Sequence, residues 1–394
     1  MICGMDRIRV VQIVESMVGG VREHLRQIAA NIDRERFELT LMCSAERDPG
    51  LRAELDGWRA GGVSVIEVPM ARSISPWHDF RCYRRIRRHL AARRFDVIHT
   101  HGSKGGFLGR MAAGRNAQAF VVHTGHTFPM QWAAGLEDGF YAALERAAAR
   151  RSDCIIALTA DQKLMLVDRR IAPRETIVVL PNATDLPPLP GADERRVARE
   201  RLGLPPDAPV VGMVGRVVEQ KAPALFLSIA RMVLAMNPPV RFVWVGGGPL
   251  RKPMQRLARE MGIDGGLHFA GERNDARELY AAFDIFLMTT LWEGMPYALL
   301  EAMAAGLPAI TVNVPGIREV VEHGCTGYVW QADALSLADS VLGLLHDEPR
   351  RRAIGHAARQ RVEQRHSVRE FISRLQELYV AGCERKRFGC ERSF

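Results

Sequence analysis

Residues 181–191 read PNATDLPPLPG, and this proline-rich stretch divides the chain into two blocks. Four of its residues are prolines, which fix the backbone, lack an N–H group and interrupt helices and strands. The stretch therefore predicts a linker. The chain has 394 residues, which is more than one domain usually contains, so we expect each block to form its own domain.

Before the linker, short runs of β-branched and apolar residues alternate with stretches that have a helical pattern. We expect strands at residues 9–14, 37–43, 63–68, 95–100, 119–124, 154–159 and 176–181. We expect helices between them at residues 21–32, 77–93, 104–115, 137–151 and 160–170. Strands that alternate with helices are typical of a parallel sheet covered on both faces.

The same alternation begins again after the linker. Strands are expected at residues 210–215, 241–246, 267–271, 284–290 and 308–312, with helices between them and only helices beyond residue 350. The sequence therefore predicts an α/β protein with two doubly wound, Rossmann-like domains that face a central cleft. Ligands of such domains bind at the carboxyl ends of the strands, so the residues that follow strands are the first candidates for a site.

These patterns also predict the domain boundaries. We place the N-terminal domain at residues 1–186 and the C-terminal domain at 187–370. Residues 371–394 are expected to contain a helix end that could pack back on the N-terminal domain. The sequence from residue 381 has no periodicity, so a frayed tail is expected there.

The composition is that of a soluble globular protein, with 47% hydrophobic and 25% charged residues, and it excludes a disordered or collagen-like chain. The seven cysteines are scattered without a CxxC pair, which predicts neither a zinc site nor a redox motif and favours a reduced compartment. We find no signal peptide and no stretch resembling a spanning helix. A cytoplasmic protein is expected, at most peripheral on the inner face of the cell membrane.

The net charge of +9 leaves several partners open. A basic surplus can attract nucleic acid, an anionic membrane surface or phosphorylated substrates. Aromatic residues are only 7% and are not interleaved with the basic runs, so we expect no nucleic-acid partner. Residues 81–94 hold seven arginines and no acidic residue, which suits anionic headgroups or a lipid diphosphate, although a solvated helix face explains the pattern equally well.

Two motifs at strand ends suit phosphate groups. Gly19 and Gly20 lie between the first strand and a helix, where backbone N–H groups can approach an anion, or where a tight turn merely needs glycine. In GRVVEQK (215–221), Arg216 and Lys221 flank a strand end, and both could reach one diphosphate.

A third motif suits sugar hydroxyls. Residues 293–301 read EGMPYALLE, and Pro296 fits the first turn of a helix, which places Glu293 just before the helix. Glu301 falls on an apolar face of that helix, where a carboxylate is costly unless it is bonded. Glutamate oxygens accept hydrogen bonds, so hydroxyl groups of a ligand are suitable partners.

Histidines gather at two adjacent strand ends. His99 and His101 end one strand, in HTHGSKGG, and Lys104 opens the next helix. His123 and His126 follow the next strand. Gly125 and Pro129 bracket His126 in a turn that is expected to expose it, whereas His123 keeps the strand phase that would bury it. Either histidine could face the ligand.

Taken together, these motifs resemble the retaining glycosyltransferases of family 4, which have the GT-B fold. The resemblance runs from about residue 8 to residue 370. It is carried by the Gly19–Gly20 turn, HTHGSKGGFLGR (99–110), HTFP (126–129), PNATD (181–185), GRVVEQK (215–221), VGGGPL (245–250) and EGMPYALLEAMAAGLP (293–308). Its most specific part is the spacing of Glu293 and Glu301. HTHGSKGGFLGR looks like the variant found in bacterial exopolysaccharide and lipid-linked glycan enzymes.

This resemblance implies transfer of a sugar from a nucleotide-diphosphate sugar, with UDP the commonest nucleotide and GDP still open, to a glycan or lipid-linked acceptor. It implies that Arg216 and Lys221 hold the diphosphate, Glu301 the ribose and Glu293 the donor sugar. The implied catalytic residues are His126, or His123 as the alternative, with Glu293, Arg216 and Lys221. Further donor-binding residues are Gly20, Gly294, Met295, Pro296 and Tyr297. The acceptor-side candidates are Gly19, His101, Ser103 and Lys104.

Two departures from the family pattern are small: Ala222 and Ala183 stand where glycines are usual. The chain contains no Asp-x-Asp sequence, so we expect neither a metal nor another cofactor. The resemblance implies a front-face mechanism. Four alternatives are a nicotinamide-dependent dehydrogenase, a nucleotide-sugar epimerase, a phosphorylase and a non-catalytic subunit of a sugar-transfer complex. The dehydrogenase is disfavoured because no complete GxGxxG follows the first strand.

Overall fold

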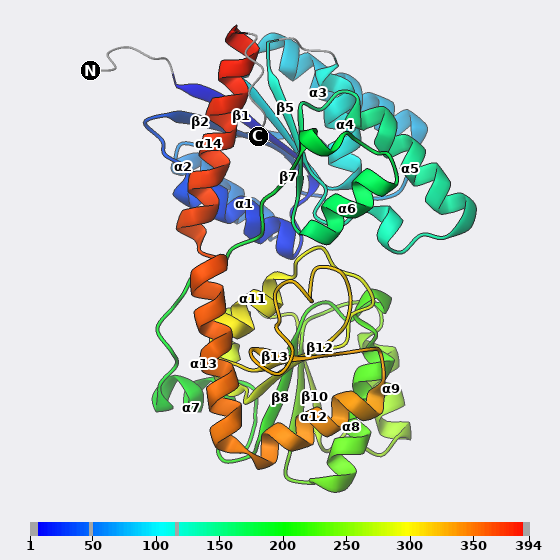
Figure 1. Cartoon of the computed structure of the whole chain (residues 1–394), viewed down its shortest axis with the longest axis vertical. Coiled ribbons are helices and arrows are strands. Elements are labelled where there is room, and N and C mark those ends of the chain that lie inside the picture. The colour runs from blue at the N-terminus through cyan, green and yellow to red at the C-terminus, as the bar shows by residue number, and fades with distance from the viewer. Residues whose placement is uncertain (1–6, 47–49, 115–117, 389–394) are drawn as a thin grey trace. The chain divides into compact units, whose positions relative to one another are not determined.

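The computed structural model describes residues 7–46, 50–114 and 118–388. The chain divides into two compact units (Figure 1), each described here by itself: unit 1 comprises Met1–Asn182 and Val368–Phe394, and unit 2 comprises Ala183–Ser367. The sequence placed the two boundaries after residues 186 and 370. The observed boundaries lie slightly earlier because Asn182 is buried in unit 1, whereas the backbone N–H of Thr184 already bonds to His366 in unit 2.

Among the described residues, unit 1 forms a parallel sheet of seven strands in the order β3-β2-β1-β4-β5-β6-β7. These strands are β1 (Ile8–Ser16), β2 (Phe37–Ser44), β3 (Ser64–Glu67), β4 (Val97–His101), β5 (Phe120–Thr124), β6 (Cys154–Ala157) and β7 (Ile177–Val179). Its helices are α1 (Gly20–Asn31), α2 (Leu51–Ala60), α3 (Pro76–Ala92), α4 (Ser103–Ala113), α5 (Gly135–Ala149), α6 (Ala160–Asp168) and α14 (Val368–Phe388), with single 3-10 turns η1 (Pro129–Gln131) and η2 (Arg174–Thr176). The central strands are almost wholly buried because helices cover both faces.

Unit 2 repeats this architecture with a parallel sheet whose described strands run in the order β10-β9-β8-β11-β12-β13. They are β8 (Val210–Val214), β9 (Arg241–Val245), β10 (Leu267–Gly271), β11 (Ile285–Met288), β12 (Ala309–Val312) and β13 (Gly327–Trp330). The helices are α7 (Ala192–Arg201), α8 (Pro223–Met236), α9 (Arg251–Glu260), α10 (Ala276–Leu279), α11 (Tyr297–Ala304), α12 (Ala334–His346) and α13 (Glu348–Arg365), with 3-10 turns η3 (Glu219–Lys221) and η4 (Tyr280–Ala282). The predicted two doubly wound α/β units are confirmed. The edge strand β13 was missed because it is short and half-exposed.

The C-terminal helix α14 belongs to unit 1, where it packs against α1 and β5 (Figure 1). The expectation of fraying from residue 381 is wrong as far as Phe388, because the last turns of this helix are anchored. Gly382 lies against the ring of Phe120, Cys383 is buried, and Lys386 forms an ion pair with Asp153. Residues 389–394 of the expected tail lie outside the described residues.

Both sheets have a topological switch point, where the strand order reverses. In unit 1 it lies between β1 and β4, and in unit 2 between β8 and β11. Crossover helices on the two sides of such a point leave in opposite directions, which opens a crevice at the carboxyl ends of the two strands. The chain segments that follow these four strands are therefore where each unit is built to hold a ligand.

Candidate active site

A buried ion pair occupies the switch point of unit 2. Lys221 ends η3, just after β8, and its ammonium donates to Oε1 of Glu293, which follows β11. The same carboxylate oxygen accepts the hydroxyl of Thr290 at 3.0 Å. Glu293 is only 6% exposed, so its charge is held by Lys221 and Thr290 rather than by bulk water.

The two segments that carry this pair are joined by backbone contacts. The N–H of Leu291 bonds to the carbonyl of Gln220 at 2.8 Å, and the Thr289 hydroxyl bonds to the carbonyl of Lys221 at 2.9 Å. Gln220 returns a side-chain bond to the carbonyl of Trp292 at 2.8 Å. The position of Lys221 is therefore fixed relative to that of Glu293. Arg216 lies exposed in the same loop, at the carboxyl end of β8.

Glycines that we did not single out from the sequence shape the same loops. A Cβ on Gly246 would lie 2.0 Å from the carbonyl oxygen of Gly215, and one on Gly248 would lie 2.5 Å from that of Val217. A Cβ on Gly316, after β12, would lie 1.9 Å from the carbonyl oxygen of Gly294. Each glycine lets two backbones pack closer than any side chain allows. VGGGPL (245–250) gave a sequence signal for the first two, whereas nothing marked Gly316.

The segment from Glu293 to Tyr297 is buried. Helix α11 begins at Tyr297, and Pro296 precedes it as the N-cap, one residue earlier than a first-turn position. This arrangement leaves backbone N–H groups of the first helical turn beside Gly294 and Met295. Glu301 lies one helical turn further along α11. Its carboxylate accepts hydrogen bonds from Tyr280 Oη and Arg277 Nε, each at 3.1 Å. Burial, and next the charge of Glu301, raise the pKa of Tyr280.

Ala222, which stands at a usual glycine position, has φ 43° and ψ 59°, in the left-handed region. An L-residue pays roughly 1–2 kcal/mol there, whereas glycine does not, although glycine loses more entropy on folding. We expect Ala222→Gly to raise the free energy of unfolding of the chain by about 0.5–1 kcal/mol. Urea denaturation checks this. The matched control, Ala353→Gly on the exposed side of α13, should cost about 1 kcal/mol. If A222G were less stable than the wild type, the backbone at Ala222 would not be strained.

The first switch point, in unit 1, contains the glycine pair. Gly19 has φ 61° and ψ −134°, a conformation that strongly favours glycine, and Gly20 begins α1. Both residues are exposed. Gly19 is therefore needed for the tight turn. Gly20 lies at the N-terminus of a helix, where its backbone N–H could still approach an anion.

Histidines fill the carboxyl ends of β4 and β5 and form one hydrogen-bonded chain. Nε2 of His126 lies 3.2 Å from Nδ1 of His101, whose Nε2 lies 2.6 Å from Oε1 of Gln12. Gln12 donates to Tyr379 Oη at 3.0 Å. Tyr379 lies 2.6 Å from Nδ1 of His99. The chain thus links the turn after β5 to helix α14.

The donors along this chain can be assigned. An amide oxygen only accepts, so His101 carries its proton on Nε2 and accepts at Nδ1 from the N–H of His126. Tyr379 accepts from Gln12 and so donates to His99, whose other nitrogen donates to Thr124 Oγ1 at 2.8 Å. Burial lowers the pKa of His99, His101 and His126 well below the usual value, so all three rings are neutral at pH 7.

The prediction that the turn exposes His126 is wrong, since its side chain is only 8% exposed. Its backbone has φ 59°, and its ring packs against those of His101 and His24 rather than pointing to solvent. His123 is also buried, as its strand phase indicated, but it lies apart from this chain. Its Nδ1 bonds with Thr100, and its ring packs against Gly106 of α4.

The four acceptor-side candidates have different environments and do not form one exposed group. The ammonium of Lys104 is bound by the carboxylate of Asp79 at 2.7 Å and by the carbonyl of Ser73. His101 is completely buried. Ser103 is exposed at the start of α4, and Gly19 is exposed in its turn. The structure therefore gives Lys104 a role in joining α4 to α3.

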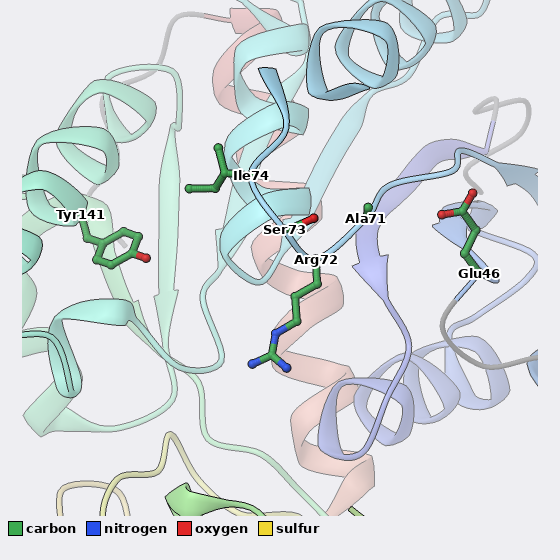
Figure 2. A pocket seen from close by; sticks show the side chains of 6 residues that line it. All are labelled: Glu46, Ala71, Arg72, Ser73, Ile74 and Tyr141. Carbon is green, nitrogen blue, oxygen red and sulfur yellow. The ribbon is translucent and has the colours of Figure 1, made fainter. Parts of the chain in front are cut away.

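Unit 1 also has a hollow of about 690 Å³ that the sequence did not indicate. It is lined by the segment Ala71, Arg72, Ser73 and Ile74, together with Glu46 and Tyr141. Figure 2 shows the Arg72 guanidinium extending from this segment, with the Tyr141 hydroxyl on one side and the Glu46 carboxylate on the other. A cationic, an anionic and several uncharged side chains thus share this surface.

Two parallel, doubly wound sheets, the second with a lysine–glutamate pair at its switch point, define the class: this is a GT-B fold. The model of the glycosyl transferases group 1 matches residues 194–361, and that of the glycosyl transferase 4-like domain matches residues 19–183. The chain therefore belongs to the family 4-type glycosyltransferases of group 1, and it is a glycosyltransferase.

Individual relatives agree with this. Over 376 residues the chain is 28% identical to the UDP-Gal:alpha-D-GlcNAc-diphosphoundecaprenol alpha-1,3-galactosyltransferase of Escherichia coli, covering 94% of this chain and 95% of that protein. It is 30% identical over 310 residues to the D-inositol 3-phosphate glycosyltransferase of Xylanimonas cellulosilytica, covering 74% and 73%. The crystal structure of Anabaena HepE with UDP and glucose has a TM-score of 0.80 at 19% identity, covering 95% and 100%. Across the described residues, no helix has the length and hydropathy needed to span a membrane.

Proposed function

We propose that this chain transfers a sugar from a UDP-sugar to a lipid-linked glycan acceptor, with retention at the anomeric carbon and without a metal ion. The observation that carries the proposal is the Lys221–Glu293 pair at the switch point of unit 2, with Arg216 exposed in the same loop. Such a site offers positive charge to a diphosphate and a carboxylate to sugar hydroxyls within one rigid frame.

The substrates are proposed from the relatives. The Escherichia coli protein is named for a UDP-galactose donor and a GlcNAc-diphosphoundecaprenol acceptor, and its alignment spans nearly the whole of both chains. These two compounds are therefore the first donor and acceptor to test. Within unit 1, Arg72 in the hollow of Figure 2 is a suitable group for the acceptor diphosphate.

We assign the chemical roles as follows. As the bond between the sugar C1 and the diphosphate oxygen breaks, Arg216 and Lys221 stabilise the charge that grows on the departing UDP. Glu293 binds donor hydroxyls and, with the N–H groups around Gly294–Tyr297, orients the oxocarbenium-like sugar. Glu301 binds the ribose hydroxyls in an orientation that Tyr280 and Arg277 fix. By family resemblance, Gly20 contacts the diphosphate and His126 the donor sugar.

Retention follows from attack on the same face of the sugar. The acceptor hydroxyl oxygen bonds to C1 on the side from which UDP departs, and its proton passes to the leaving phosphate oxygen. Glu293 is bonded to Lys221 and Thr290, which suits the binding of hydroxyl groups better than attack on C1 as a nucleophile. Positive charge from Arg216 and Lys221 supports transfer without a metal.

One reaction tests all parts of this proposal. Untagged protein is incubated with UDP-α-galactose and GlcNAc-diphosphoundecaprenol, with and without EDTA, and the product is analysed by proton NMR. We expect an α-linked disaccharide lipid in equal yield in both samples. A β-linked product would overturn retention, and loss of product in EDTA would overturn metal independence.

The surface of unit 1 supports membrane contact for a lipid-linked acceptor. Ile74, Trp77 and Phe80, at and before the start of α3, are 66%, 80% and 50% exposed. Four arginines of the same helix line a second hollow of about 550 Å³ with His89: Arg81, Arg84, Arg85 and Arg88. Exposed apolar groups beside clustered arginines suit the boundary between anionic headgroups and acyl chains.

We therefore predict that Arg84→Glu with Arg88→Glu lowers binding to phosphatidylglycerol vesicles about tenfold or more, since each basic residue near such a surface contributes about 1 kcal/mol. Vesicle sedimentation at two salt concentrations checks this. Arg350→Glu with Arg352→Glu on α13 makes the same change of net charge elsewhere. If both double variants lost vesicle binding equally, the net charge of the chain, and not the arginines of α3, would explain the binding.

A further inference from the structure

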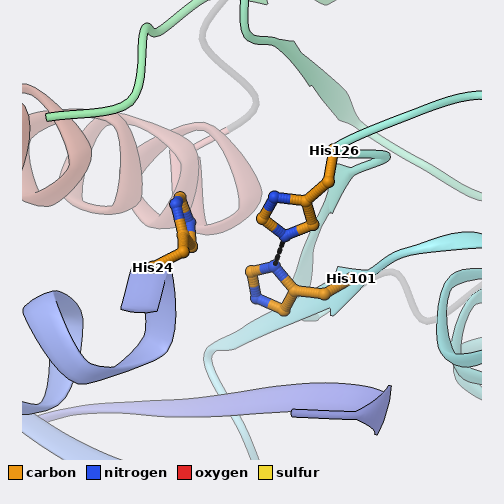
Figure 3. Close-up of side chains that lie close together, drawn as sticks. All are labelled: His24, His101 and His126. Atoms are coloured by element: carbon orange, nitrogen blue, oxygen red, sulfur yellow. Dashed lines mark hydrogen bonds between the residues drawn. The ribbon is translucent and has the colours of Figure 1, made fainter. Parts of the chain in front are cut away.

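Three histidines from different elements of unit 1 converge near the switch point of its sheet. His24 comes from α1, His101 ends β4, and His126 lies in the turn after β5. Figure 3 shows the three rings turned toward a common space. One candidate ligand nitrogen from each ring lies within 4.8 Å of those of the other two, and all three side chains are buried.

The spacing of the rings suits a tetrahedral metal centre. Ring centres lie 5.5 Å apart for His24 and His101, 4.8 Å for His24 and His126, and 5.4 Å for His101 and His126. Three imidazoles on one zinc ion, with bonds of about 2.0–2.1 Å, place their ring centres about 5 Å apart. Nδ1 of His101 and Nε2 of His126 now point at each other. Small rotations of these side chains would turn both nitrogens toward a common metal ion.

The surroundings of the rings are those of ligand histidines. Nδ1 of His24 lies 3.3 Å from Oδ1 of Asn182, and Nε2 of His101 lies 2.6 Å from Oε1 of Gln12. Amide oxygens accept hydrogen bonds, so His24 carries its proton on Nδ1 and His101 carries its proton on Nε2. The lone pairs available to a metal ion therefore lie on Nε2 of His24 and Nδ1 of His101. Metal-binding histidines are normally held by hydrogen bonds of this kind.

The third ring needs one rearrangement. His126 donates the N–H on Nε2 to His101, and this proton moves to Nδ1 when Nε2 becomes a ligand. The ring stays neutral and no proton is released, so the only charge that the cluster gains is that of the ion. Three histidines leave a fourth position for water, as in open zinc sites.

We propose that His24, His101 and His126 form a binding site for zinc or a similar divalent ion, and that the bound ion inhibits sugar transfer. Inhibition rests on the proposed function, in which His126 contacts the donor sugar, because a ring bound to metal is withdrawn from that contact. Metal binding itself does not rest on it. The ion is thus an inhibitor of an enzyme that needs no metal for its reaction.

The experiment measures binding and inhibition separately on the untagged, metal-free, full-length chain. Co²⁺ titration should give the visible absorption of a tetrahedral centre at one ion per chain, and Zn²⁺ should displace it. Zn²⁺ should also raise the melting temperature. His24→Gln should weaken Zn²⁺ binding at least tenfold, and Asn182→Ala about tenfold, while His356→Gln on the exposed face of α13 keeps wild-type affinity.

In the transfer assay, Zn²⁺ should inhibit the wild type at the concentration at which it binds, and His24→Gln should keep its basal rate while losing this inhibition. The absence of a tetrahedral cobalt spectrum, or unchanged affinity in both His24→Gln and Asn182→Ala, would overturn the site. Tight binding without inhibition would overturn its inhibitory role. If the chain transferred no sugar at all, the cobalt spectrum and the two variants would still decide whether the site exists.

Discussion

Replacing Lys221 by Met, or Glu293 by Gln, is expected to lower the rate of sugar transfer about a hundredfold to a thousandfold. Each side chain is nearly buried and bonded to the other, so its charge acts on the reacting centre with little screening by water. Removing one preorganised group that stabilises charge in a transition state typically costs this much. The loss should appear in kcat more than in KM, because the charge on UDP grows during the reaction.

The controls separate chemistry from folding. Each single change leaves a buried partner without its counter-charge, so circular dichroism and the melting temperature must show that the variant is folded at the assay temperature. The double variant K221M/E293Q restores neutrality and should be about as inactive as either single variant, because the two groups act as a unit. Lys252→Met, an exposed lysine at the start of α9, should transfer normally. Near-normal turnover by K221M or E293Q would remove both residues from the mechanism.

Arg110→Met is expected to lower the free energy of unfolding by about 3–5 kcal/mol, the largest stability effect that we predict. The guanidinium is completely buried and bonds to both carboxylate oxygens of Glu145, at 2.7 and 2.9 Å, and to the carbonyl of Gly106 at 2.9 Å. Without it, the Glu145 carboxylate stays buried without its counter-charge. Urea denaturation at pH 7 measures the loss.

Two comparisons test that explanation of Arg110. The double variant R110M/E145L removes both charges and should recover most of the lost stability. Arg196→Met breaks the exposed pair with Glu200 and should change the urea midpoint little, because water screens such a pair. If R110M unfolded at the urea concentration of the wild type, or if the double variant were no more stable than R110M, the buried ion pair would not explain the stability.

The architecture could be predicted because it depends on local patterns. Apolar runs such as 210–215 alternate with helical stretches, and a sheet buried on both faces requires such runs. We expected that the C-terminal helix end could pack back on the N-terminal domain, and α14 does belong to unit 1, but the contacts that hold it there join residues far apart in the sequence. Gln12 and Tyr379, which hydrogen-bond to each other, are separated by 367 positions.

The candidate site was predicted unevenly for the same reason. Lys221 and Glu293 follow strands, so the sequence alone predicts that they share the edge at the carboxyl ends of β8 and β11. The inward position of His126 was not predicted, because its contacts with His24 and His101 join three separate elements and its backbone has a positive φ that is uncommon for a residue other than glycine. Gly316 was missed because its function is to admit another backbone, that of Gly294, which the sequence does not identify.

The His101 environment shows a further limit. Lys104, in HTHGSKGGFLGR (99–110), was an acceptor-side candidate, yet its ammonium is bound by the carboxylate of Asp79, and Arg110 of the same motif is bound by that of Glu145. Charged residues of a helix that follows a strand join helices as readily as they bind ligands, and only their partners distinguish the two roles. The motif was chosen because it resembles the family. In the structure its histidines belong to a hydrogen-bonded network, whereas Lys104 and Arg110 form ion pairs that join helices.

The most direct test of the central proposal is a mass-spectrometric transfer assay with GlcNAc-diphosphoundecaprenol as the acceptor and UDP-galactose, UDP-glucose, UDP-N-acetylglucosamine and GDP-mannose as separate donors. We predict that the acceptor gains the mass of one sugar from a UDP-sugar and none from GDP-mannose. K221M should lower the rate of product formation about a hundredfold or more, whereas K252M should not. Transfer from GDP-mannose alone, or a UDP-dependent product that K221M makes at the wild-type rate, would contradict the account.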